Sequence, residues 1–174
     1  MAILPIRVFP DPVLRVKCRD VTDFDDKLRK LAADMIETMH AAPGVGLAAP
    51  QVGRDIRLAV LDLSVGEDPN QVYAIVNPEI ALREGSETAE EGCLSLPGIT
   101  DKVERPERIV VHAFDLAGKP IEIHAEEWLA RAFCHEIDHL NGVLFTDYLR
   151  GLRKERVRRQ LKKLAAEQSV GVGA

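Results

Sequence analysis

The hydrophobic positions near the start of the chain repeat with a helical period. Between Thr22 and Pro43 the apolar residues are spaced by three, four, one and three positions: Leu28, Leu31, Met35, Ile36 and Met39. This spacing places them on one face of a helix, which Pro43-Gly44 ends. Upstream, Asp11-Pro12 is typical of an N-cap followed by proline at the first helical position, so we expect a short helix there that ends near Cys18.

Between residues 44 and 125 the pattern changes to short runs of alternating apolar and polar positions, separated by turn residues. No helical segment of useful length lies between the runs, so parallel crossover connections are not expected. Asp115–Gly118 has the composition of a hairpin turn. The pattern predicts mostly antiparallel sheets built from six strands: Ile56–Leu63, Val72–Val76, Ile80–Arg83, Ile99–Val103, Ile109–Phe114 and Ile121–His124.

The helical period returns at Ala125 and continues to Asn141-Gly142. A last run follows Gly151, with apolar residues at i, i+4 and i+7, and indicates a C-terminal amphipathic helix: Val157, Leu161 and Leu164. We find no internal repeat and no linker. The chain is therefore predicted to be one α+β domain, with residues 1–149 as its body and residues 150–174 as a basic C-terminal helix and tail of the same domain.

Composition limits the class of protein. At 174 residues, with 46% hydrophobic and 29% charged residues, the chain is long enough to fold without a disulfide or a metal. Its three cysteines are widely spaced, and no apolar run approaches the 18 residues of a membrane span. Met1–Asp11 resembles neither a signal peptide nor a transit peptide, so we expect a cytoplasmic protein without a membrane partner.

The candidate chemistry begins with the H-E-x-x-H sequence His135–His139, inside the second predicted helix. A spacing of four residues puts both imidazoles on one face, where they can share a metal, and leaves Glu136 beside the open coordination position. The alternative is a solvated helix with two surface histidines. Because the helix is otherwise lined by apolar residues, we favour the metal site.

A catalytic site of this kind normally has a third protein ligand. Metzincin proteases take this ligand from a downstream histidine, but the matching position here is Phe145. Thermolysin-like proteases take it from a glutamate of a later helix, and the only downstream glutamates, Glu155 and Glu167, lie in the basic last helix, which makes that class a weak match. Upstream, Cys93 follows Gly92 and offers a soft thiolate ligand. The alternative is that Cys93 is only a small buried hydrophobic residue. We interpret Cys18 and Cys134 in that way.

A third element, Gly44–Gln51, is rich in small residues that let the backbone approach a ligand closely. It carries Gln51, whose amide N–H is the kind of donor that stabilises a developing oxyanion beside a metal. A tight turn between a helix and a strand would explain the glycines equally well.

Taken in order, these three segments resemble the signature motifs of the peptide deformylases: G-x-G-L-A-A-x-Q at Gly44–Gln51, E-G-C-L-S at Glu91–Ser95 and H-E-x-D-H-L from His135. The resemblance extends from about Met1 to Tyr148. It implies an α+β fold of antiparallel sheets around a central metal-binding helix. It also implies that residues 1–149 are a catalytic domain that removes the N-formyl group from the initiator methionine of nascent polypeptides, releasing formate.

The resemblance also assigns roles at the reacting centre. Cys93, His135 and His139 would hold one divalent metal ion, and a metal-bound hydroxide would attack the formyl carbon. Glu136 would act as general base and then as general acid. Ferrous iron is the expected native metal, with zinc, nickel or cobalt as substitutes, because ligands of this kind suit several transition metals.

Further residues are assigned by the same resemblance. The Leu94 backbone N–H and the Gln51 amide would stabilise the oxyanion. The substrate-binding residues would be Gly44, Val45 and Gly46, with the peptide added as a strand beside them and Val45 lining the methionine pocket. Arg105 is expected to pair with Glu91 and so hold the Cys93 loop, the alternative being an exposed strand arginine.

Two other functions compete with a deformylase. One is a metal-dependent peptidase, which the missing downstream ligand disfavours. The other is a non-catalytic, metal-stabilised binding domain, which Glu136→Ala would distinguish because only an enzyme would lose turnover.

Charge suggests one more partner. The segment from Arg150 to Lys163 carries a charge of +7 within a chain of −5, so the remaining 160 residues carry −12. The resemblance includes members whose C-terminal helix contacts the ribosome, and this helix has the charge to do so transiently. No sequence-specific nucleic-acid partner is expected. The alternative is a solvated helix face that covers the body.

Overall fold

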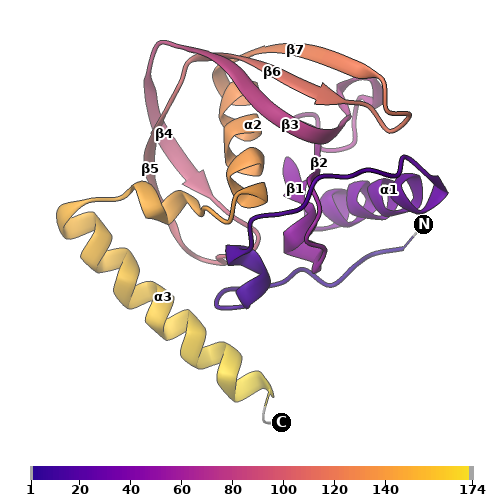
Figure 1. Ribbon diagram of the computed structural model, residues 1–174. Helices are drawn as coiled ribbons and strands as arrows, with labels where there is room; N and C mark the ends of the chain where they lie inside the picture. The colour runs from indigo at the N-terminus through magenta and orange to yellow at the C-terminus, as the bar shows by residue number, and fades with distance from the viewer. Residues whose placement is uncertain (1, 173–174) are drawn as a thin grey trace.

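Two antiparallel sheets surround one helix in the computed structural model, which describes residues 2–172 (Figure 1). The larger sheet has the strand order β1-β2-β3-β6-β7, and β4 pairs with β5 in a separate two-stranded sheet. This arrangement confirms the predicted α+β class with antiparallel sheets. The strands are β1 (Gly46–Ala48), β2 (Leu58–Leu61), β3 (Tyr73–Glu84), β4 (Glu87–Gly92), β5 (Thr100–Arg105), β6 (Arg108–Phe114) and β7 (Pro120–Glu126).

Three α-helices accompany the strands over these residues: α1 (Asp26–Ala41), α2 (Glu127–Leu140) and α3 (Gly151–Val172). Asp25 caps α1 by accepting a hydrogen bond from the Leu28 N–H at 3.0 Å. Within residues 2–172, no helix combines the length and the apolar character needed to cross a membrane.

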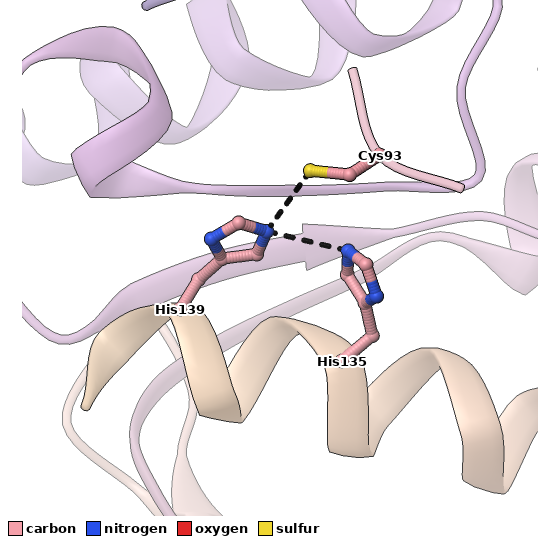
Figure 2. A group of neighbouring side chains, drawn as sticks. All are labelled: Cys93, His135 and His139. Carbon is pink, nitrogen blue, oxygen red and sulfur yellow. Dashed lines mark hydrogen bonds between the residues drawn. The ribbon is translucent and has the colours of Figure 1, made fainter. Parts of the chain in front are cut away.

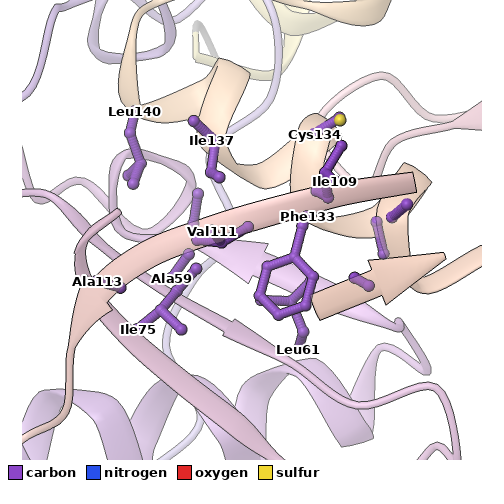
Figure 3. Packing of buried hydrophobic residues seen from close by; sticks show 14 of the residues in the cluster. Ala59, Leu61, Ile75, Ile109, Val111, Ala113, Phe133, Cys134, Ile137 and Leu140 are labelled. Atoms are coloured by element: carbon purple, nitrogen blue, oxygen red, sulfur yellow. The ribbon is translucent and has the colours of Figure 1, made fainter. Parts of the chain in front are cut away.

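Helix α2 is the element around which the larger sheet is arranged. Its residues Phe133, Ile137 and Leu140 are buried against strand residues of the sheet, among them Leu61 and Val111 (Figure 3). Burying each such side chain stabilises the fold by roughly 1.5–3 kcal/mol. Because these positions share one helix face, residues 135 and 139 are presented on another.

Strand β2 is buried on both of its faces, which explains its uninterrupted apolar sequence. Ala59 and Leu61 face α2, whereas Leu58 and Val60 pack with α1 residues such as Met35. Helices α1 and α2 therefore cover opposite sides of this part of the sheet.

The sequence prediction of two separate strands at 72–83 is wrong, because β3 is continuous through Asn77-Pro78. Its first half pairs with β2 and most of its second half pairs with β6, with a register shift after Val76. Asn77 has a φ of 49°, and its side-chain amide bonds the backbone N–H and C=O of Val21 at 2.8 and 3.0 Å. The turn-like dipeptide is thus a bulge and not a strand end.

Three other elements differ from expectation. Strand β4 was not predicted, because its sequence, Glu87–Gly92, is almost entirely polar. Strand β1 was not predicted either, because it has only three residues. The first helix is a short 3₁₀ turn, Pro12–Arg15, although Asp11 does cap it by accepting from the Val13 N–H at 3.0 Å.

Helix α3 lies at the outside of the molecule (Figure 1) and is attached to it by two kinds of contact. Val157 and Leu164 are buried in a cluster that includes Val103 of β5. Arg153 and Arg156 form ion pairs with the buried carboxylate of Asp101. On these contacts we propose that residues 150–172 fold together with the body as one domain.

This proposal predicts the effect of truncating a buried side chain of α3. Leu164→Ala should lower the free energy of unfolding of the whole chain by about 2 kcal/mol, the lower end of the range for a buried leucine. The free energy of unfolding is measured by urea unfolding, followed by the fluorescence of Trp128, the single tryptophan. Trp128 lies in α2, so its fluorescence reports the unfolding of the body and not of α3 itself. Leu152→Ala is the control, because Leu152 is 90% exposed on the same helix. An unchanged Trp128 transition in Leu164→Ala would show that α3 is a separate unit.

Candidate metal centre and active site

Three potential metal ligands converge between α2 and the loop that joins β4 to β5. The Nε2 atom of His139 lies 3.2 Å from Nε2 of His135 and 3.3 Å from Sγ of Cys93 (Figure 2). All three ligand atoms lie within 4.8 Å of one another, and no other group of His, Cys, Asp or Glu side chains in residues 2–172 does so. The helical spacing brings the two imidazoles together, and Gly92 at the end of β4 leads directly into Cys93.

The separations of these atoms fit a shared transition-metal ion. With Zn–N bonds of 2.0–2.1 Å and Zn–S bonds of 2.3 Å, tetrahedral angles place two nitrogens about 3.3 Å apart and a nitrogen and a sulfur about 3.6 Å apart. The observed 3.2 and 3.3 Å are close to both values. The chemistry of the donors also fits, because a thiolate with two imidazoles suits zinc, iron and similar ions.

Proton positions in the histidine pair favour the same conclusion. His135 Nδ1 lies 2.9 Å from Oε1 of Glu91, which fixes the tautomer that leaves Nε2 free as a ligand. Burial alone would lower the pKa of His135, but Cys93 and Glu91 raise it to about 10. Burial and the charge of His135 hold the pKa of His139 well below its ordinary value. Without a metal, His135 is therefore the ring that carries a positive charge at neutral pH, and a divalent cation would replace the proton on its Nε2 while Nδ1–H stays bonded to Glu91.

Glu91 is the centre of a buried network behind His135. Its two oxygens accept from Arg105 Nε at 2.8 Å and Nη2 at 2.9 Å, from Arg131 Nη1 at 2.7 Å and from His135 Nδ1. Burial by itself raises the pKa of this carboxyl, but the bonds and charges of Arg105 and His135 lower it to about 2. Arg105 is thus a buried ion-pair partner of Glu91 and not an exposed strand residue.

The sequence alone did not lead us to Arg131, because only the apolar residues and the H-E-x-x-H residues of this helix were given roles. It lies four residues before His135, so the helical period places its side chain on the same face as both histidines. The same spacing that identified His135 and His139 was therefore available as a signal for Arg131.

Glu136 points toward β1 and is enclosed by it. A Cβ atom on Gly46 would collide with the Glu136 carboxylate, so only glycine allows this approach. Burial, the largest effect, raises the pKa of Glu136 to about 7. Its Oε2 atom is buried and has no hydrogen-bond partner within the described residues. A carboxyl with these properties can both accept and return a proton near neutral pH.

Gln51 comes from the 3₁₀ turn Ala49–Val52 and is held by both ends of its amide. Oε1 accepts from the Ala48 N–H at 2.9 Å, while Nε2 donates to Ser95 Oγ at 3.1 Å and lies 3.6 Å from Cys93 Sγ. The side chain is buried, so its N–H groups are fixed beside the candidate metal ligand. This is the preorganisation that an oxyanion donor requires.

A single pocket of about 650 Å³ joins the three motifs. Val45 is 43% exposed along it, and Trp128 of α2 is 59% exposed. The lining includes residues of β1 and its flank, the β4–β5 loop and α2: Gly44, Val45, Gly46, Gln51, Glu91, Cys93, Leu94, Trp128, Arg131, His135 and Glu136.

The remaining histidines and cysteines lie outside this pocket. His40 contacts Asp62 at 2.7 Å, and His112 and His124 both contact Glu122 on the exposed side of β6 and β7. Cys18 and Cys134 are both buried, and burial raises the pKa of each thiol to about 11.

Comparison with known proteins identifies the family. The family model described as polypeptide deformylase matches residues 3–155. The chain belongs to the polypeptide deformylase family. A peptide deformylase of Alkalilimnicola ehrlichii is 51% identical over 99% of this chain and 97% of its own length. One of Acinetobacter baumannii is 50% identical over 97% and 95%. The crystal structure of a peptide deformylase from Legionella pneumophila superposes with a TM-score of 0.88 at 46% identity, covering 97% of this chain and 98% of the other.

Membership of this deformylase family makes the chain an enzyme that removes a formyl group, a hydrolase of protein biosynthesis. The two competing functions, a metal-dependent peptidase and a non-catalytic binding domain, are thereby disfavoured. The geometry of the pocket still has to explain how the individual residues act.

The contact between Gly46 and Glu136 gives a first test of that geometry. Gly46→Ala should lower deformylation kcat/KM by about 10²-fold, because the new Cβ displaces either the carboxylate or β1, and misplacement by about 1 Å is enough for such a loss. Activity on a formyl-Met peptide, with metal content measured in parallel, checks this. The control is Gly171→Ala in α3, where an added Cβ meets nothing within 4 Å. Full activity of Gly46→Ala would mean that Glu136 does not act from this position.

Proposed function

We propose that this enzyme hydrolyses the formyl amide of N-formyl-methionine at the start of nascent polypeptides and releases formate, using one divalent metal ion held by Cys93, His135 and His139. The observation that carries the proposal is the convergence of three soft and borderline ligand atoms in a pocket that also contains a buried, unpaired carboxylate. Three protein ligands are typical of catalytic sites, in which a further position is left for water or substrate.

When bound, such an ion supplies Lewis acidity, which polarises an amide carbonyl and makes water nucleophilic near neutral pH. The side chains of the protein then have to transfer one proton. Glu136 accepts it from the attacking water and returns it to the departing amine nitrogen, for which a pKa near 7 is well suited. The charge that develops on the formyl oxygen is met by two donors, the Gln51 amide and the Leu94 backbone N–H.

The substrate peptide is proposed to bind along β1. This strand is at one end of the sheet order and pairs only with β2 among the described residues, so its other edge is open to an added strand. The missing Cβ atoms of Gly44 and Gly46 leave room beside β1 for two side chains of the site: a Cβ on Gly44 would lie 2.8 Å from Leu94 Cδ1, and one on Gly46 would collide with the Glu136 carboxylate. Val45 supplies apolar surface to the pocket that would take the methionine side chain.

Ferrous iron is our proposal for the native metal, with zinc, nickel or cobalt as substitutes, since the ligand set suits them all. Because a ferrous centre and its thiolate are sensitive to oxidation, anaerobic purification followed by elemental analysis is the measurement that separates these ions.

The roles of the carboxylate and of the ligands differ, and substitutions separate them. Glu136→Gln should keep one metal ion per chain and the fold but lose turnover by orders of magnitude, because it removes only the proton carrier. His139→Ala and Cys93→Ala should lose both metal and turnover. The measurements are elemental analysis and an assay with a formyl-Met peptide beside its unformylated form. Near-normal turnover in Glu136→Gln would disprove the proposed mechanism, and full metal retention in either other variant would remove that residue from the metal site.

We further propose a transient contact between α3 and the ribosome. Not all of the basic residues of α3 are available for it, because Arg153 and Arg156 pair with Asp101 and Arg150 donates to the carbonyl groups of Asp147 and Leu149. Four others form no ion pair with a residue in the range 2–172: Lys154, Arg159, Lys162 and Lys163. The first group anchors the helix, and the second is placed to meet phosphate.

Charge reversal separates this contact from catalysis. The triple substitution of Arg159, Lys162 and Lys163 by Glu should abolish salt-sensitive co-sedimentation with ribosomes while leaving kcat/KM on a short formyl-Met peptide within about twofold. Reversal of three exposed cations elsewhere is the matched control: Lys17, Arg54 and Lys119. Equal loss of binding in both triple variants, or none in either, would contradict a specific role for α3.

A further inference from the structure

We infer that Arg131 is a positioning residue of the metal centre, which couples the helix that carries the two histidines to the strand that leads to Cys93. The inference rests on the proposed metal site and adds a residue to which no role has been assigned above. Arg131 lines the same pocket, but within residues 2–172 it forms no hydrogen bond or ion pair with the three ligand atoms, so its effect on the metal has to pass through its partners.

The first partner is Glu91. Arg131 Nη1 donates to Oε2 at 2.7 Å, on the carboxylate whose Oε1 accepts from His135 Nδ1 at 2.9 Å. One carboxylate thus links the guanidinium to the ligand ring. Residues that hold a ligating histidine through such a carboxylate orient the ring and raise its affinity for the metal.

The other partners are main-chain carbonyl groups of the β4–β5 sheet. Arg131 donates from Nη1 to Val103 O and from Nη2 to Glu87 O, both at 2.8 Å. Strand β4 carries Glu91 and ends at Gly92, immediately before Cys93. A single side chain of α2, one turn before His135, therefore fixes the strand that delivers the third ligand. Arg105 also links Glu91 to α2, through Asp138, but within residues 2–172 it donates to no main-chain carbonyl group of the sheet.

Arg131 also contributes positive charge that balances the buried carboxylate of Glu91. The network contains two carboxylates, Glu91 and Asp138, and two guanidinium groups, Arg105 and Arg131, with Arg105 Nη1 2.6 Å from Asp138 Oδ2. Without Arg131, the buried carboxylate of Glu91 would lose one of its two guanidinium partners beside His135. A buried charge that loses its partner is strongly unfavourable, so the carboxylate would move or attract water, and the ring it holds would lose its fixed orientation.

Arg57 offers a matched control. It is another buried arginine that links the end of α2 to a strand: it donates to Oδ1 of Asn141, the C-cap of α2, at 2.9 Å and to O of Pro78 in β3 at 2.7 Å. It has no contact with Glu91. Arg57→Gln should therefore reproduce the general cost of removing a buried arginine without reaching the metal centre.

The experiment compares Co(II) binding by wild type, Arg131→Gln, Arg131→Lys and Arg57→Gln. We expect Arg131→Gln to weaken Co(II) affinity, measured by chelator competition, by about 10- to 100-fold and to alter the visible Co(II) spectrum. Arg131→Lys should show a smaller loss, because lysine keeps the charge but cannot bridge the carboxylate and the carbonyl groups together. Arg57→Gln should bind Co(II) as wild type does.

Unchanged affinity and spectrum in the Arg131 variants, or an equal change in Arg57→Gln, would overturn the inference. If Arg131→Gln does not fold, Arg131→Lys against Arg57→Lys decides on the same two readouts. Failure of the proposed site itself would look different, because wild type would then bind no Co(II) or His139→Ala would bind it normally.

Discussion

Helix α2 has to satisfy two opposed demands, and the rest of the structure follows from them. One face is buried in the larger sheet through Phe133, Ile137 and Leu140. The rest of the helix surface has to hold two imidazoles and a carboxylate: His139 and Glu136 are buried, and the His135 side chain is only 11% exposed. Desolvation of ionisable groups is expensive unless they are paired, so the helix needs polar partners on that side as much as it needs a core on the other.

The small β4–β5 sheet supplies those partners. Glu91 and Arg105 come from its two strands and are buried against α2, where they neutralise each other and fix the proton of His135. Glu136 differs: within residues 2–172 it forms no ion pair, it faces the bare backbone of Gly46, and burial raises its pKa to about 7. In the proposed mechanism, two carboxyls close to one metal site thus have separate tasks, one structural and ionised, the other reactive, because their surroundings differ.

Local sequence patterns predicted much of this arrangement. The helical period placed α1, α2 and α3, and the two-residue period found the strands whose one face is apolar. The elements that were missed depend on tertiary contacts: β4 is a polar strand stabilised by pairing with β5, and Asn77 bends β3 without ending it because its side chain bonds Val21. The helical period does place Arg131 on the face of His135, but the period alone does not show that its guanidinium is buried against Glu91, and so Arg131 was overlooked.

The candidate site was more accessible to sequence reasoning than the fold, because ligand chemistry restricts residue type and spacing. H-E-x-x-H on a helix leaves few alternatives, whereas the choice of Cys93 as third ligand came from a family resemblance and needed the three-dimensional contact to support it. The central claim, a metal ion held by one sulfur and two nitrogens, is tested most directly by X-ray absorption on the zinc-loaded enzyme. The account predicts one Zn–S distance of about 2.3 Å with two histidine nitrogens at about 2.0–2.1 Å. A spectrum with nitrogen and oxygen neighbours only would contradict it.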